Sequence, residues 1–140
     1  RKILPCYAIQ NKLFIHAGLT NQFLNQHKLN NIPINDLVNL INNSMLNNFR
    51  NNNFNFRDNI FLNNNGPYWT RDNYDKFPTN IVQIVGHTIK NTIELSPLKN
   101  IIYLDIGLTM GNKIGYLEIF NDKYIAHEGN YNQINTRFLM

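Results

Sequence analysis

Ile81-Val82-Gln83-Ile84-Val85-Gly86-His87-Thr88 is the most informative segment for the fold, because a nearly continuous apolar run leads here into a glycine and a histidine. Such a run, over residues 81–85, predicts a strand that is buried on both faces. A second apolar strand, over residues 12–16, ends in His16, which Ala17 and Gly18 follow. In open α/β sheets the strand ends face the ligand crevice, so we expect His16 and His87 to converge on one metal ion or substrate.

The spacing of apolar residues predicts the other elements. Apolar residues recur at spacings of three and four from Ile34 to Phe49 and predict a helix, with Asn35 or Asp36 as its N-cap. Further along the chain the period changes to two and predicts strands over residues 101–105, 114–120 and 123–127. Asn121-Asp122 suits a tight hairpin, and the asparagine-rich residues 51–65 suit a loop with one further turn of helix. The pattern indicates a mixed α/β (α+β) fold.

Length, charge and cysteine content exclude several classes of protein. The chain has 140 residues, of which 43% are apolar, and it shows no linker or internal repeat. It begins at Arg1 within apolar sequence. We therefore expect residues 1–140 to be a single partial domain that lacks an N-terminal portion. No apolar run of membrane-spanning length and no signal-peptide pattern occurs, which favours a cytoplasmic protein without a membrane partner. The net charge of +4 is scattered and does not indicate nucleic-acid binding. Cys6 is the only cysteine and is expected to be buried.

Other polar residues are candidates for the same chemistry. Arg71 lies close to Trp69, the only tryptophan, and a guanidinium held by an aromatic packing anchor can offer its planar fork to two phosphate oxygens. The alternative is a surface arginine beside a core tryptophan. Asp105 ends a predicted strand, where it suits either a turn or a contact to a ligating histidine. His27 and His127 have no partner motif.

Several short sequence blocks follow one another between residues 4 and 119, in the order in which a known family has them. They are Leu4-Pro5, Leu13 to Leu19, Gly66 to Asp72, Ile84 to Thr88, Tyr103 to Gly107, Gly111 to Lys113 and Leu117 to Ile119. Together they resemble the second half of calcineurin-like metallophosphoesterases, in particular the bacterial and phage serine/threonine phosphatase type. The resemblance implies the C-terminal half of a metallophosphatase-type β-sandwich, with two mixed sheets face to face and helices outside.

The resemblance also implies a site and a reaction. His16 and His87 would ligate one metal of a two-metal centre, holding Mn²⁺, Fe or Zn²⁺, and Arg71 would hold the phosphoryl group of a phosphoprotein or small phosphate ester. The family's Asp-x-His, Gly-Asp-x-x-Asp-Arg-Gly and Gly-Asn-His blocks do not occur in this chain, so its general-acid histidine would lie upstream. The intact protein is expected to be a metal-dependent phosphatase, and this chain by itself to be inactive. Ile89, where many phosphodiesterases have a second histidine, favours the phosphatase branch.

Two alternatives remain open from the sequence. Within the same fold, hydrolysis of dinucleoside polyphosphates is the first, although Thr88 stands where that branch has a bulky aromatic residue. The second is a non-catalytic binding module for nucleic acid, which would use the positive charge and stacking by Phe54, Phe56 and Tyr68.

Overall fold

The computed structural model describes residues 4–50, 59–63, 66–71, 73–107, 111, 113–130 and 132–139. Its helical elements are α1 (Asn21–Gln26), α2 (Ile34–Arg50) and the 3-10 helix η1 (Tyr74–Lys76). Its strands are β1 (Tyr7–Ile9), β2 (Lys12–Ile15), β3 (Val82–Val85), β4 (Glu94–Leu95), β5 (Ile101–Tyr103), β6 (Ile114–Phe120), β7 (Lys123–Asn130) and β8 (Gln133–Phe138). The mixed α+β class expected from the sequence is confirmed.

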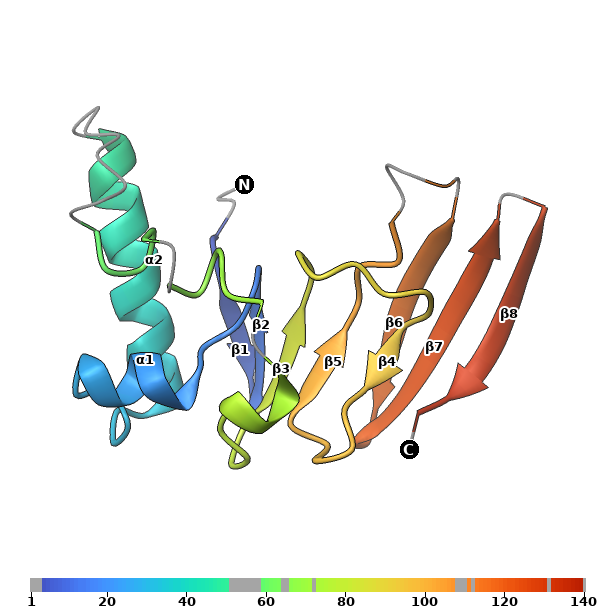
Figure 1. Cartoon of the computed structure of the whole chain (residues 1–140), viewed down its shortest axis with the longest axis horizontal. Coiled ribbons are helices and arrows are strands. Elements are labelled where there is room, and N and C mark those ends of the chain that lie inside the picture. Colours follow the sequence, from blue (N-terminus) through green and yellow to red (C-terminus); the bar gives the residue numbers. More distant parts are fainter. Residues whose placement is uncertain are drawn as a thin grey trace.

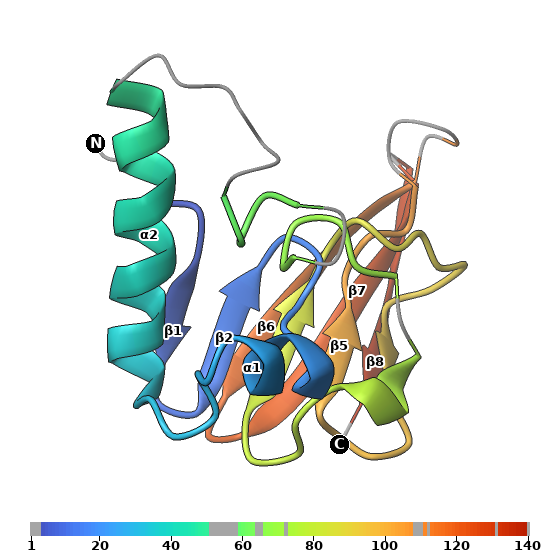
Figure 2. The ribbon, with the colours of Figure 1, turned by 60° about the vertical axis from the view of Figure 1, so that its left-hand side comes forward.

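The strands form two sheets (Figure 1). The larger has the order β1-β2-β3-β5-β4, in which β2, β3 and β5 are parallel neighbours and the two outer strands are antiparallel. The smaller sheet is the antiparallel meander β6-β7-β8. Figure 2 shows α1 and α2 on one side of the larger sheet and the smaller sheet on its other side. The larger sheet is therefore the middle layer of three.

Two apolar cores account for this layering. One core lies between the helices and the larger sheet and includes Leu13, Val85 and Ile41. The other lies between the two sheets and includes Ile84 and, from β7, Tyr124 and Ala126. Successive residues of β3 thus enter different cores, because side chains alternate across a strand. This explains why β3 is an almost continuous apolar run.

The β6–β7 hairpin confirms its prediction and also ties the sheets together. Asn121 and Asp122 have φ values of 46° and 61°, as the tight two-residue hairpin turn requires. The carboxylate of Asp122 accepts a hydrogen bond from the ammonium group of Lys12 on β2. Lys12 is otherwise buried, with 3% of its surface exposed. The pair gives this buried cation a partner from the other sheet.

Helix α2 confirms the predicted helix but not its cap. The helix begins at Ile34, and Leu37 N donates to Pro33 O at 3.0 Å, so Asn35 and Asp36 lie in its first turn and neither is the N-cap. The carboxylate of Asp36 still favours the helix through the dipole. The expectation for residues 51–65 falls mostly outside the described residues. No helix in the described ranges is long and apolar enough to cross a membrane.

Candidate functional site

The parallel pairing of β2 and β3 brings two histidines together. Ile15 pairs with Val85, so the two strands end side by side, and Gly86 N donates to His16 O at 2.9 Å. The Nε2 atom of His16 lies 3.1 Å from Nδ1 of His87, and the ring centroids are 4.8 Å apart. The structure therefore places both imidazoles at the carboxyl ends of neighbouring strands, as expected from the sequence.

A loop that precedes β3 adds a cation to the pair. Ala17 N and Gly18 N both donate to Pro67 O, at 2.8 and 3.0 Å, which fixes this loop on the turn after β2. From the same loop Arg71 reaches the histidines, and its Nε donates to Nε2 of His87 at 3.3 Å. Arg71, His87 and His16 form a continuous chain of polar groups, which we call the histidine–arginine cluster.

The hydrogen bonds define the protonation of this cluster. Arg71 Nε carries a hydrogen, so Nε2 of His87 must accept, and the proton of the neutral His87 ring is then on Nδ1. That proton is donated to Nε2 of His16. Burial above all, followed by His16 and Arg71, lowers the pKa of His87, although the Trp69 backbone and Asp105 oppose the shift. In this arrangement Arg71 donates to a neutral His87 ring.

Aromatic rings enclose the two imidazoles. Tyr68 stacks on His16 with a centroid distance of 6.1 Å and an interplanar angle of 20°. Trp69 lies edge-on to His87, at 5.8 Å and 86°. Trp69 is 51% exposed, so it is a wall of the site, and the alternative of a surface arginine beside a core tryptophan is not what the structure has. The hydroxyl of Tyr68 is buried and makes no hydrogen bond to the residues that the structure describes, and burial raises its pKa.

Unusual backbone conformations and one buried amide hold the site in place. His87 has φ = 57°, which non-glycine residues rarely adopt and which often marks a functional position. Gly18 has φ = 117°, and a Cβ there would lie 2.5 Å from Cε1 of Phe77. The fully buried side chain of Gln83 accepts from Leu19 N at 2.7 Å and donates to Leu19 O at 2.9 Å. A polar residue inside an apolar run was the available signal for this role of Gln83, and sequence reasoning missed it.

The other candidate residues have structural partners. Asp105 Oδ1 accepts from Gly107 N at 2.9 Å, which is the turn role considered for it. Cys6 is buried, its thiol contacts Asn42 Oδ1 at 3.4 Å, and burial raises its pKa to about 12. A thiol with this pKa is not a nucleophile at neutral pH. His27 packs against Phe23, with 4.7 Å between their ring centroids.

The binding-module alternative gains no support from the aromatic residues chosen for it. Phe54 and Phe56 lie outside the described residues. Tyr68 is only partly exposed and is packed against His16, so its ring is part of the cluster's wall.

Solved structures resemble this chain in fold. A cold-active protein-tyrosine phosphatase of a psychrophilic Shewanella species matches with a TM-score of 0.65 and 18% identity, over 98% of this chain and 43% of that protein. A point mutant of a cold-active protein-tyrosine phosphatase matches with a TM-score of 0.64, 18% identity and the same coverage. A further cold-active protein-tyrosine phosphatase structure matches with a TM-score of 0.59 and 19% identity, over 95% of this chain and 41% of that one. No protein-family model and no curated protein sequence matches. The chain thus spans less than half the length of these phosphatases, and the likeness concerns the fold.

These findings contradict the resemblance to calcineurin-like metallophosphoesterases and its serine/threonine phosphatase branch. The three similar structures are all named as protein-tyrosine phosphatases. The expectation of two divalent metal ions is contradicted as well, since the described residues include no group of three or more His, Cys, Asp and Glu side chains able to hold a metal ion. His16 and His87 supply only two such groups. The participation of His16, His87 and Arg71 in the site remains a prediction.

Proposed function

We propose that this chain supplies the phosphate-binding part of a phosphatase that acts on phosphotyrosine in proteins. The observation that carries the proposal is the contact of the Arg71 guanidinium with two linked imidazoles at the ends of parallel strands. The fold likeness to proteins named protein-tyrosine phosphatases supports this class of enzyme. Small phosphate esters as substrates and a cytoplasmic location stay predictions from the sequence.

Arg71 is the group that would bind the phosphoryl oxygens. Its Nε is engaged by His87, and the described residues offer its two Nη groups no hydrogen bond. A guanidinium edge of this kind can donate two parallel hydrogen bonds to a phosphoryl group. Its exposed position beside the half-exposed Trp69 leaves room for a ligand to approach.

The two imidazoles would exchange protons with the substrate. A bound phosphoryl group brings negative charge next to His87, and nearby opposite charge favours the protonated imidazolium. Protonation places a hydrogen on Nε2 of His87, which then no longer accepts from Arg71. From this nitrogen His87 can donate to the leaving oxygen as a water molecule attacks the phosphorus, which matters for tyrosine because its phenolate has a pKa of about 10. His16, bonded to His87 at 3.1 Å, is placed to pass a proton to or from it. Cys6 takes no part, because its thiol is buried and protonated.

The test is binding of inorganic phosphate to the 140-residue chain, measured by titration calorimetry and by chemical shifts of the histidine rings. We expect saturable binding that shifts the signals of His16 and His87 and that weakens when Arg71 is replaced by alanine. Arg50, exposed at the end of α2, provides the matched control Arg50→Ala with the same loss of charge.

Substrate class is tested separately, on hydrolysis of p-nitrophenyl phosphate and of phosphotyrosine and phosphoserine peptides by the longest form of the protein that can be prepared. We expect phosphotyrosine to be the preferred residue. Phosphate binding that is absent, or that is equally strong in Arg71→Ala and Arg50→Ala, would refute the proposed site.

A further inference from the structure

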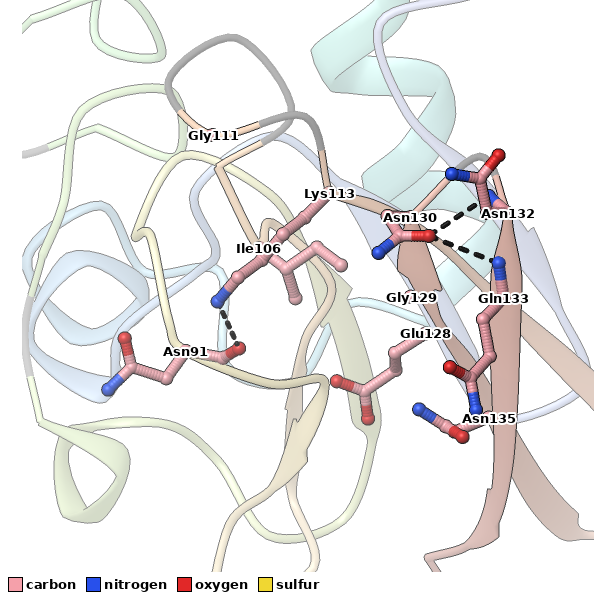
Figure 3. Close-up of a pocket in the computed structure, with 10 residues that line it drawn as sticks. All are labelled: Asn91, Ile106, Gly111, Lys113, Glu128, Gly129, Asn130, Asn132, Gln133 and Asn135. Atoms are coloured by element: carbon pink, nitrogen blue, oxygen red, sulfur yellow. Dashed lines mark hydrogen bonds between the residues drawn. The ribbon is translucent and has the colours of Figure 1, made fainter.

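A polar cavity of about 630 Å³ lies between the β7–β8 hairpin and the segments that follow β3 and β5 (Figure 3). The end of the β7–β8 hairpin lines one side of it, and Asn91 and Ile106 line the other. Asn91 comes four residues after His87. Because an extended chain spans at most about 3.6 Å per residue, the cavity wall is within about 14 Å of the histidine–arginine cluster.

Carboxamide groups give this cavity its hydrogen-bonding character. Gln133 and Asn135 lie two residues apart on β8 and so share the face that is turned to the cavity. Neither side chain makes a hydrogen bond within the described part of the chain. Asn130 Oδ1 accepts from the backbone of Asn132 and of Gln133, at 2.9 and 3.1 Å, which leaves its amide NH₂ group available (Figure 3). The cavity therefore presents several amide donors to a ligand.

One unbalanced positive charge distinguishes the cavity. The carboxylate of Glu128 is already satisfied, by Arg137 Nη2 at 2.6 Å and by Ile93 N at 3.0 Å. Lys113 donates to Asn91 O at 3.2 Å and forms no ion pair with any residue that the structure describes. The Glu128–Arg137 pair is neutral, so among the described residues that line the cavity the ammonium group of Lys113 supplies the net charge.

We propose that this cavity binds an acidic side chain of the substrate peptide, on the same peptide as the phosphorylated residue. The proposal rests on the proposed function, since it places the phosphoryl group at Arg71 and extends the peptide toward Lys113. A carboxylate there accepts from the Lys113 ammonium group and from the amides of Gln133 and Asn135. Because the cavity wall lies within about 14 Å of the cluster, an extended peptide of about four residues is long enough to reach it, so we place the acidic residue within about four positions of the phosphotyrosine.

The experiment compares peptides that differ only in charge. Phosphotyrosine peptides with Glu, Gln or Lys placed at each of the four positions on either side are titrated into the 140-residue chain by fluorescence anisotropy. We expect the Glu peptide to bind about three- to fivefold more tightly than the Gln peptide at one or more positions, the size of effect for a solvent-exposed ion pair. In Lys113→Glu the preference should reverse toward the Lys peptide.

Lys123→Glu is the control, because Lys123 is also exposed but begins β7, at the opposite end of the hairpin from Asn130. It should keep the preference for Glu. An identical preference in Lys113→Glu and Lys123→Glu would overturn the proposal, and so would equal affinity for the Glu and Gln peptides at every position. Binding of inorganic phosphate separates the two failures: phosphate that binds without any peptide preference refutes the cavity alone. A Lys113-dependent preference for unphosphorylated Glu peptides, with no phosphate binding, supports the cavity and refutes the proposed function.

Discussion

Two histidine networks in this molecule look alike in their hydrogen bonds but differ in what they leave available. On the outer face of the smaller sheet, His127 contacts Thr136 Oγ1 at 3.0 Å and Glu118 Oε2 at 3.1 Å, and Tyr116 stacks on it with centroids 4.3 Å apart. Both of its ring nitrogens have partners across neighbouring strands. In the histidine–arginine cluster the network instead ends in a guanidinium whose Nη groups are not bonded to any described residue. We therefore consider a network a candidate site when it ends in a donor or acceptor that has no partner among the residues that the structure describes.

The backbone makes the second difference. His127 lies in a regular strand, where its side chain follows the ordinary alternation of the sheet. His87 lies directly after a strand at φ = 57°, a conformation that the surrounding structure must hold in place. Side chains within regular strands are spread over the faces of a sheet, whereas side chains in the turns after neighbouring parallel strands can converge on one site. Whether a histidine of this protein is a candidate functional residue therefore depends more on its location in the fold than on its residue type.

The buried amide of Gln83 supports the histidine–arginine cluster, and its removal should have the largest effect on stability. Gln83→Leu keeps the size of the side chain but leaves Leu19 N and Leu19 O without partners in a buried position. Each of the two unsatisfied groups costs about 1–3 kcal/mol, so we expect the free energy of unfolding to fall by about 2–6 kcal/mol. Urea denaturation measures it. The control is Thr136→Val on the outer face of the smaller sheet, where the loss should stay below about 1 kcal/mol; losses of equal size would contradict the assigned role of Gln83.

Arg71→Ala tests whether phosphate binds at the histidine–arginine cluster and not at the His127 network. A hydrogen bond to a charged group contributes about 1.5–3 kcal/mol, so the Kd for inorganic phosphate should rise by about 10- to 100-fold. Arg71→Lys should recover only part of the affinity, because an ammonium group cannot donate in the bidentate geometry. Titration calorimetry on both variants gives the values. Full affinity in Arg71→Ala would remove the distinction between the two networks.

The effect of pH follows from His87. Its pKa is lowered in the folded protein, so its neutral form contributes stability that is present above its ordinary value of about 6.5 and is lost as pH falls through the folded value. NMR titration of the ring should therefore give a midpoint below 6.5, and Arg71→Gln should move it upward by removing a nearby cation. Saturating phosphate should also move it upward. A midpoint above 6.5 without phosphate would show that the hydrogen bond from Arg71 to a neutral ring does not form.

Much of the fold was predictable because an element with one buried face has apolar residues at regular intervals along its sequence. β3 and β6 and helix α2 show apolar periods of the kind that each element requires, and their extents agree closely with expectation. β8 was missed because all six of its residues are exposed, so no buried face imposes an alternating pattern. The short strand β4 has only two residues, too few to show a period.

The site was predictable only in part, for a different reason. The positions of His16 and His87 follow from the rule for strand ends, and the structure brings them together. The enclosure by Tyr68 depends on how a loop folds back through Pro67, which no local pattern encodes. The expected metal centre was wrong because it came from short motif matches. The structure adds no third ligand from the described residues.

Removal of the His127 side chain, on the smaller sheet, should change stability only slightly. His127→Ala removes the contacts to Glu118 and Thr136 and the stacking with Tyr116, all on an exposed face. Exposed contacts of this kind contribute about 0.2–1 kcal/mol, so the urea midpoint should fall slightly while the Kd for phosphate stays the same. Glu118→Gln, which keeps a hydrogen-bond acceptor but removes the charge, should have a still smaller effect on stability. Both ring nitrogens of His127 already have partners, so neither variant should change the phosphate affinity. A changed affinity would mean that phosphate also binds on this face. The Nη groups of Arg71 would then not be what distinguishes the two networks.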